Sequence, residues 1–340
     1  MRTILLFLLA AYLCLSCTNP QTMCEAVVSF PKTADLEAEI LPVPVPVLLP
    51  RYIGIMDDYL YIYKEKEEKL FAFFNLKDGS YITDEGTRGQ GPDEFILLDV
   101  RGFNKLDDNC FSVFEAGSNL LKTVHFDGMK LSVQGAKPVF KQGVTSNGFY
   151  SLADSMYLTL GRLEGTSEYC LLNGKTGELK EIGEYPSWVR REDVVDNPPL
   201  FVPYLKVCAV HPNGKKVVAF YTRFKHLRVY NDAMNLLHDV DVQIPPCSSD
   251  FQKPVQEQPV YYIGAPCVTE KYIYVLCANT HTDSGQGELQ VWNWEGKPVA
   301  CFRLDRKLSM IALDDRNHKI YAIDSQIDNE LYVYDLPSMN

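Results

Sequence analysis

The side chains best suited to chemistry are spread along the chain without the spacing of a known catalytic motif. The histidines stand far apart, so none form the close pair that a metal site on one element shows. They are His125, His211, His226, His238, His281 and His318. The sequence also contains no G-x-S-x-G nucleophile elbow and no phosphate-binding loop. These patterns give no support to a serine hydrolase or a nucleotide-binding enzyme.

Two acidic loops carry oxygen ligands. The segment Thr280–Glu288 places Asp283 and Glu288 in a polar hairpin, and oxygen-rich loops can hold calcium. The order of its residues is not that of an EF-hand. The second loop, Asp314–Asn317, is explained more simply as a turn between two strands. Asp283 and Glu288 are therefore weak metal-ligand candidates, and calcium is the one cofactor that the sequence suggests.

Two long irregular segments carry aromatic side chains. Glu184–Tyr204 contains Trp188, and Cys247–Gly264 contains Tyr261 and Tyr262. Function often resides on such loops when a rigid scaffold holds them. These rings could stack on a sugar or a peptide, or they could only cover one end of the fold. The sequence leaves both alternatives open.

The cysteine with the most specific setting is Cys17. An apolar run, Ile4–Leu13, follows Arg2 and is far shorter than the ~20 residues of a membrane-spanning helix. The pattern predicts a cleaved secretory signal over residues 1–16. A small residue, Ser16, directly before the cysteine resembles a bacterial lipobox, which would place lipid on Cys17 and hold a soluble domain at a membrane surface. An ordinary signal peptide with an incidental cysteine is the alternative.

The other cysteines divide into two groups. Five lie in apolar, strand-like runs and are expected to be buried free thiols: Cys110, Cys170, Cys208, Cys277 and Cys301. Three lie in segments expected to be loops, where an oxidising compartment permits disulfides: Cys24, Cys247 and Cys267. Spacing does not give their connectivity, and none of the eight has the spacing of a zinc motif.

Composition narrows the class of partner. The formal net charge is -11, and removing residues 1–16, which contain one Arg and no acid, makes it -12. An acidic protein repels phosphate backbones, which argues against nucleic acid. Hydrophobic residues make up 46% and aromatic residues 12% of the chain, as in a well-packed globular protein.

An internal repeat predicts the scaffold that positions these side chains. Six short β-branched and aromatic runs start 51, 46, 60, 56 and 47 positions apart. They are Tyr59–Tyr63, Cys110–Phe114, Met156–Leu160, Lys216–Phe220, Tyr272–Leu276 and Lys319–Ile323. Periods of ~40–50 residues are typical of propeller blades. Each run is followed by a second one that ends in a turn rich in Asn, Asp or Gly, as a hairpin requires. The pattern predicts an all-β, six-bladed β-propeller.

The ring needs an outer strand for its last blade. The last repeat stops at Asn340 after its third strand, and an uncovered edge would remain. Asp35–Leu41 alternates apolar and acidic residues, so we expect this N-terminal strand to close the last blade. The expected domains are then a signal peptide at 1–16, a tether at 17–34 and a propeller at 35–340.

One glycine-rich segment, Gly86–Phe95 (GTRGQGPDEF), follows the first repeat. It resembles the G-x-G-P-x-E-F segment of TolB-like six-bladed propeller lipoproteins of Bacteroidetes-type bacteria. The glycines permit unusual backbone conformations, so the favoured role is a turn between blades. The functional alternative has Arg88, Asp93 and Glu94 lining a ligand site at the mouth of the ring. The resemblance implies a cell-envelope lipoprotein and carries over no catalytic residue.

Two hypotheses of function follow. The first is a non-catalytic binding or scaffolding lipoprotein that holds an envelope protein or glycan. It would sit on the outer membrane through its lipid anchor alone, in the periplasm or on the cell surface. The second is a hydrolase that resembles the propeller lactonases, with acidic and amide side chains from several blades around a divalent cation in the central channel. Such ligands come from separate repeats and leave no linear motif, so the missing motif does not decide between the two hypotheses, whereas a metal-free protein that calcium fails to stabilise would count against the hydrolase.

Overall fold

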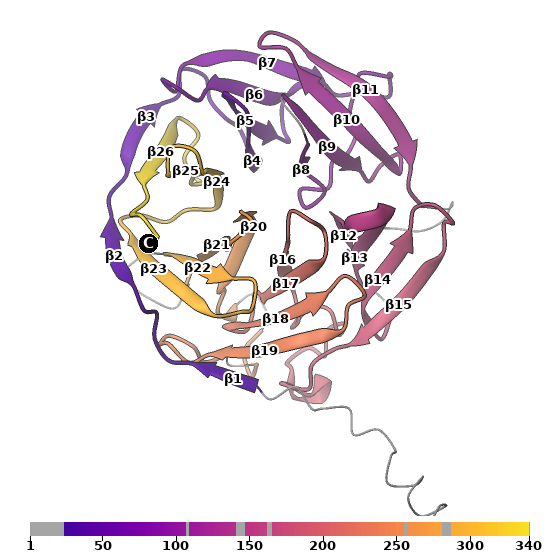
Figure 1. Cartoon of the computed structure of the whole chain (residues 1–340), viewed down its shortest axis with the longest axis vertical. Coiled ribbons are helices and arrows are strands. Elements are labelled where there is room, and N and C mark those ends of the chain that lie inside the picture. Colours follow the sequence, from indigo (N-terminus) through magenta and orange to yellow (C-terminus); the bar gives the residue numbers. More distant parts are fainter. Residues whose placement is uncertain are drawn as a thin grey trace, which may run out of the picture.

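The computed structural model describes residues 24–106, 109–140, 147–161, 165–249, 251–254, 257–280 and 287–339. These residues form six β-sheets arranged as a ring, in which each sheet is one blade (Figure 1). The predicted six-bladed β-propeller is therefore confirmed. The expected signal peptide and Cys17 lie outside the described residues.

The first three blades each consist of four antiparallel strands in chain order, from the centre outwards. Blade 1 contains β4 (Pro50–Met56), β5 (Tyr59–Lys64), β6 (Lys69–Asn75) and β7 (Tyr81–Thr87). Blade 2 contains β8 (Asn104–Lys105), β9 (Cys110–Glu115), β10 (Leu120–Phe126) and β11 (Leu131–Pro138). Blade 3 contains β12 (Asn147–Ser151), β13 (Met156–Leu160), β14 (Ser167–Asn173) and β15 (Leu179–Glu184), with the 3-10 helix η1 (Ala153–Ser155) between β12 and β13.

The last three blades each gain a strand from the N-terminal segment. Blade 4 contains β16 (Lys206–Val210), β17 (Lys216–Tyr221), β18 (His226–Asn231), β19 (Leu236–Val242) and, outermost, β1 (Cys24–Val27). Blade 5 contains β20 (Tyr262–Val268), β21 (Tyr272–Cys277), β22 (Glu288–Asn293), β23 (Pro298–Leu304) and β2 (Thr33–Leu36). Blade 6 contains β24 (Met310–Asp314), β25 (Lys319–Ile323), β26 (Glu330–Asp335) and β3 (Glu39–Pro42). A second 3-10 helix, η2 (Arg191–Asp193), precedes blade 4.

The N-terminal segment follows the outer rim of blades 4, 5 and 6, as Figure 1 shows. Its third strand, β3, pairs antiparallel with β26, so the predicted closure of the last blade is confirmed. The expected single strand Asp35–Leu41 is divided between two strands. Its first residues belong to β2, which ends at Leu36 and pairs in parallel with β23, and only β3 closes blade 6.

The expected tether at 17–34 needs a correction, because the chain joins the ring from Cys24 onwards. β1 pairs in parallel with β19, and Phe30 is buried edge-on against Trp292 with ring centroids 5.0 Å apart. The physical reason is the free edge of each outer strand, whose backbone N–H and C=O groups need partners that the N-terminal segment supplies.

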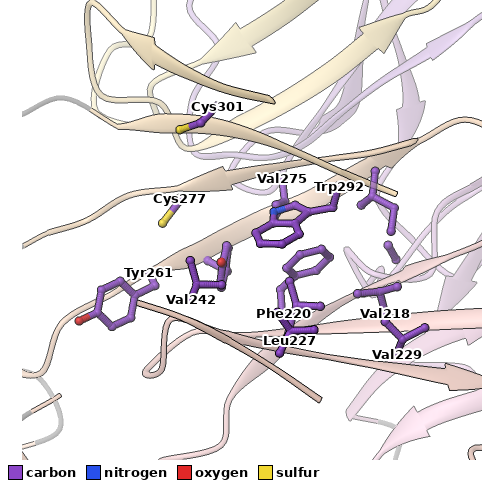
Figure 2. Packing of buried hydrophobic residues seen from close by; sticks show 14 of the residues in the cluster. Val218, Phe220, Leu227, Val229, Val242, Tyr261, Val275, Cys277, Trp292 and Cys301 are labelled. Carbon is purple, nitrogen blue, oxygen red and sulfur yellow. The ribbon is translucent and has the colours of Figure 1, made fainter. Parts of the chain in front are cut away.

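Apolar side chains between neighbouring blades form the core. Figure 2 shows one such cluster, in which Phe220 of blade 4 lies beneath Trp292 of blade 5. Aromatic pairs recur between blades 1 and 2, where Tyr61 stacks on Phe111 with centroids 4.8 Å apart. A Cβ at Gly54 would lie 2.5 Å from the Tyr61 ring, so this close packing requires glycine there. The middle strands of a blade are thus apolar on both faces, which explains their strong sequence signal.

Asp305 connects the N-terminal segment to blade 6. Its carboxylate accepts hydrogen bonds from Tyr334 Oη at 2.8 Å and from Arg306 at 3.0 Å, and it faces the backbone N–H of Ala38 at 3.4 Å. Burial alone would raise the pKa of Asp305, but these hydrogen bonds outweigh it and hold the pKa below its usual range.

Because its pKa is lower in the folded protein, Asp305 stabilises the fold above its unfolded-state pKa of about 3.9, and this contribution is lost as the pH falls through the folded pKa. Asp305→Asn is therefore expected to reduce the difference in urea midpoint between pH 7 and pH 3. Asp232→Asn, at an exposed turn of blade 4, is the control and should leave that difference unchanged. An equal pH dependence in wild type and Asp305→Asn would contradict the prediction.

Candidate functional site

The innermost strands of all six blades surround a cavity of about 240 Å³ at the centre of the ring. Its wall is mostly apolar. Along each inner strand, side chains that point to the axis alternate with side chains that point away from it. Each blade contributes to the wall, in order Tyr52, Phe103, Tyr150, Cys208, Pro266 and Ile311. We refer to this cavity as the central channel.

The central channel carries positive charge. Arg51 and Arg101 both line it, and no carboxylate is among the described residues of its wall. Arg51 forms an ion pair with Glu65 at 3.0 Å, whereas the guanidinium of Arg101 makes no hydrogen bond or ion pair with the described residues. Asp99 accepts a hydrogen bond from the backbone N–H of Arg101 at 2.9 Å, and the backbone N–H groups of Gly148 and Phe149 also donate to it. Burial raises the pKa of Asp99. These hydrogen bonds and the charge of Arg101 lower this pKa by less than burial raises it, so the pKa stays above its usual value.

A hydroxyl and a thiol lie beside this charge. The Tyr150 hydroxyl accepts a hydrogen bond from the backbone N–H of Cys208 at 3.2 Å. Burial raises the pKa of Tyr150 well above its usual value. Burial also raises the pKa of the Cys208 thiol to about 12, although the charges of Lys206 and Arg101 act in the opposite direction. Both groups stay neutral near pH 7, so they can donate hydrogen bonds to a bound group but are poor nucleophiles.

A second cavity of about 330 Å³ shares Tyr52 and Phe103 with the central channel and extends to the turn after β24. Asp314 and Asp315 lie there, with Arg316. Asp314 accepts a hydrogen bond from Asn317 Nδ2 at 2.7 Å, and Arg316 reaches Asp57 of blade 1 at 3.1 Å. These side chains shape the turn between β24 and β25, as expected from the sequence, and join blade 6 to blade 1.

The structure uses the glycine-rich segment to connect blades 1 and 2. The Glu94 carboxylate accepts a hydrogen bond from the backbone N–H of Gly91 at 2.8 Å, and a Cβ at Gly89 would lie 2.0 Å from that carboxylate. Asp93 accepts from the backbone N–H of Val133 at 3.1 Å, and Arg88 donates to the carbonyl of Glu65. Arg88, Asp93 and Glu94 therefore support the turn and the outer strand β11, and none of them lines the central channel.

The three aromatic candidates pack inside the protein. Tyr261 and Tyr262 are fully buried, and their hydroxyls donate to Ser248 O at 2.7 Å and Gln290 Oε1 at 3.1 Å. They belong to the core between blades 4 and 5, so the stacking hypothesis is wrong for these two rings. Trp188 is half-buried, and its ring lies 3.9 Å from the His226 ring. It packs against Tyr221 and Phe224 of blade 4 as well.

Of the two metal-ligand candidates, the structure describes Glu288, and Asp283 lies outside the described residues. Glu288 begins β22 and accepts a hydrogen bond from Gln290 Nε2 at 2.7 Å, while Lys225 Nζ lies 3.8 Å from its carboxylate. The adjacent cation leaves Glu288 poorly suited to calcium.

Cys24, Cys208, Cys247, Cys267, Cys277 and Cys301 are free thiols in the described part of the chain. Cys267, expected in a loop, belongs to β20, and burial raises the pKa of its thiol to about 12. Cys24, also expected in a loop, belongs to β1 at the edge of blade 4. The possible disulfides among Cys24, Cys247 and Cys267 are therefore absent from the described part of the chain.

The sequence did not single out Arg101, which belongs to the short connection before β8. That inner strand has only two residues, so no apolar run marks it. Only its place in the repeat could have indicated that Arg101 lines the channel, because it lies at the start of the second repeat, where the inner strand of a blade is expected.

Comparisons with known proteins agree with this architecture. The sequence matches the TolB-like 6-blade propeller-like family over residues 29–316. A crystal structure of a DUF4221 family member from Bacteroides vulgatus has a TM-score of 0.59 at 12% identity and covers 88% of this chain and 97% of that one. A structure named as that of an exported protein from Bacteroides fragilis has a TM-score of 0.54 at 12% identity, covering 93% and 99%. At such identities the likeness shows the fold alone. No curated protein sequence gives a significant match.

Proposed function

Because the chain belongs to the TolB-like six-bladed propeller family, we propose that it is a non-catalytic binding or scaffolding lipoprotein of the cell envelope that holds a protein or glycan partner. The observation that carries the proposal is the central channel, where the Arg101 guanidinium, which has no hydrogen-bond or ion-pair partner among the described residues, faces a mostly apolar wall. Such a wall with a few polar groups is typical of a binding pocket. The arrangement suits a carboxylate or another anionic group on an otherwise apolar or sugar-like body.

The location of the protein is part of the same proposal. The apolar run before Cys17 supports export, and the likeness to a Bacteroides exported protein agrees with it. Lipid on Cys17 would hold the ring at the outer membrane, in the periplasm or on the cell surface. Within the described residues, the structure contains no helix long and apolar enough to cross a bilayer.

The lactonase-like alternative expects several blades to contribute oxygen ligands to one cation in the channel. Among the residues that line the two cavities, the carboxylates are Asp314 and Asp315, which are neighbours on one blade and lie beside Arg316. This donor set does not resemble a cation cage built from several blades. The geometry therefore favours binding.

The proposal is tested by calorimetric titration of the purified full-length protein with two probes, a trigalacturonate and a short peptide with a free C-terminal carboxylate. A neutral trigalactoside and the amidated peptide are the matched uncharged probes. Binding of at least one charged probe is expected, and Arg101→Gln should weaken it about 10- to 100-fold, as expected for a lost charge-assisted hydrogen bond.

Arg190→Gln is the matched control, because Arg190 is exposed on the loop before blade 4 and outside the channel. This variant should bind like wild type. Equal binding of charged and uncharged probes, no binding of either charged probe, or wild-type affinity in Arg101→Gln would each overturn the proposed site. Turnover of a lactone or ester that Arg101→Gln abolishes would instead favour the enzyme.

A further inference from the structure

Strand β1 places an exposed cysteine against two buried polar residues at the edge of blade 4. In the parallel pairing of β1 with β19, Cys24 lies opposite Asp239. In the antiparallel pairing of β18 with β19, Arg228 lies opposite Asp239, and His226 lies opposite Asp241. Alternate residues of a strand share one face, so all five side chains lie on the same face of the blade.

Three of these side chains have the donor atoms of a metal site. Cys24 Sγ, a ring nitrogen of His226 and a carboxylate oxygen of Asp239 lie within 4.8 Å of one another, the one such group of three that the described residues contain. Cys24 Sγ is 3.9 Å from Asp239 Oδ1, and His226 Nε2 contacts the same oxygen. Sulfur and oxygen ligands of one tetrahedral zinc ion are about 3.5 Å apart, given bonds of about 2.3 and 2.0 Å.

Neighbouring residues orient two of the three donors. Asp241 Oδ1 lies 3.7 Å from His226 Nδ1, so a carboxylate faces the imidazole nitrogen that points away from the cluster. Arg228 holds Asp239 Oδ2 at 2.8 Å, which turns Oδ1 towards the cysteine. Metal-bound histidines almost always have such a carboxylate or carbonyl partner on the second nitrogen. Trp188 covers one face of His226, with ring centroids 3.9 Å apart.

We propose that Cys24, His226 and Asp239 form a zinc site that fastens the N-terminal strand to blade 4. On binding, the Cys24 thiol gives its proton to solvent, and the metal takes the thiolate, the neutral His226 Nε2 and Asp239 Oδ1 as ligands. A water molecule completes the tetrahedron. Thiolate, imidazole and carboxylate together are the ligand set that Zn²⁺ prefers over Ca²⁺ or Mg²⁺.

The proposed zinc site lies close in sequence to the expected membrane anchor. Cys24 follows Cys17, the expected lipid attachment site, by seven positions. The pairing of β1 with β19 involves only four residues on each strand, so a metal bond would strengthen a short contact. Zinc would then fix the edge of blade 4 close to the membrane surface. The site lies at the outer rim of the ring, so it does not depend on the proposed role of the central channel.

The test is titration of the purified full-length protein with Zn²⁺ under reducing conditions, together with Co²⁺ absorption spectroscopy. Wild type is expected to bind one Zn²⁺ per chain and to give the thiolate-to-cobalt charge-transfer band with tetrahedral ligand-field bands. Asp241→Asn should weaken zinc binding about 10- to 100-fold, as loss of an outer partner of a metal ligand does. Cys24→Ser should weaken it further and abolish the charge-transfer band.

Cys247→Ser is the matched control, because Cys247 is the other exposed cysteine of the described chain. It should bind zinc and cobalt like wild type. Cys24 is exposed, so its serine variant is expected to fold, which circular dichroism verifies. Unchanged zinc affinity in Cys24→Ser, loss of the cobalt band in Cys247→Ser, or no zinc binding by wild type would each overturn the proposal.

Discussion

Replacing Glu168 with alanine is expected to lower the free energy of unfolding by about 3–5 kcal/mol, because it leaves a buried lysine without its counter-ion. Glu168 of blade 3 accepts hydrogen bonds from Lys206 Nζ at 2.8 Å and from the Tyr221 hydroxyl at 2.6 Å, both of blade 4. The side chains of Lys206 and Glu168 are only 3% and 1% exposed. Water therefore cannot replace the lost carboxylate.

Aromatic rings enclose the lysine on the remaining sides. Lys206 Nζ lies 4.9, 5.4 and 5.2 Å from the ring centroids of Tyr169, Tyr185 and Tyr221. Cation–π contacts with these rings compensate only part of the lost ion pair. The double variant Glu168→Leu with Lys206→Met removes both charges and is expected to recover most of the stability.

Urea unfolding followed by circular dichroism and tryptophan fluorescence measures both effects. Arg190→Ala is the surface control, because Arg190 is 73% exposed in its pair with Asp193, and such pairs contribute about 1 kcal/mol or less. A loss in Glu168→Ala no larger than in Arg190→Ala would show that blades 3 and 4 do not depend on this pair. A double variant as unstable as Glu168→Ala would show that packing, not the unpaired charge, causes the loss.

The sequence predicted the blades because their middle strands are buried on both faces. All six runs found from the repeat correspond to the second strand of a blade, namely β5, β9, β13, β17, β21 and β25. Inner and outer strands were harder to predict. β8 has only two residues, and β1 and β2 are held by parallel pairing with strands more than 200 residues away in the chain. Such pairing depends on the outer edge of a blade that forms from residues far away in the chain.

The candidate sites were less predictable than the fold. The wall of the central channel takes residues from six repeats, so Arg101 and Tyr150 become neighbours only when blades 2 and 3 pack against each other. Tyr261 appeared to be a loop residue, because a long irregular stretch precedes it, yet it is buried between two blades. In the sequence, His226 is one of several histidines that stand far apart, and only the pairing of β1 with β19 shows that Cys24 lies at the same edge of blade 4. In each case long-range pairing decides the surroundings of the residue.

The same long-range pairing predicts the effect of removing the N-terminal segment. Deleting residues 18–41 removes β1 and β2 and most of β3, and with them the closure of blade 6. The edge of β26 loses the pairing of Leu331 with Leu41, and the buried Leu36 is removed from the core between blades 5 and 6. Burial of such a leucine alone contributes about 2–5 kcal/mol. We expect the melting temperature to fall by about 10 °C or more, and the exposed edge to promote aggregation.

Deletion of residues 18–28 is the matched control, because it removes β1 and leaves the buried Phe30, β2 and β3 in place. It should lower the melting temperature much less, since β1 pairs through four residues that are largely exposed. A synthetic peptide spanning residues 33–47 should restore part of the stability of the longer deletion, because it can add the missing strands to the free edges. If the two deletion variants have the same melting temperature, the pairing of β3 with β26 contributes little to the stability of the ring. The contacts within each blade and between neighbouring blades must then suffice to hold blade 6 in place.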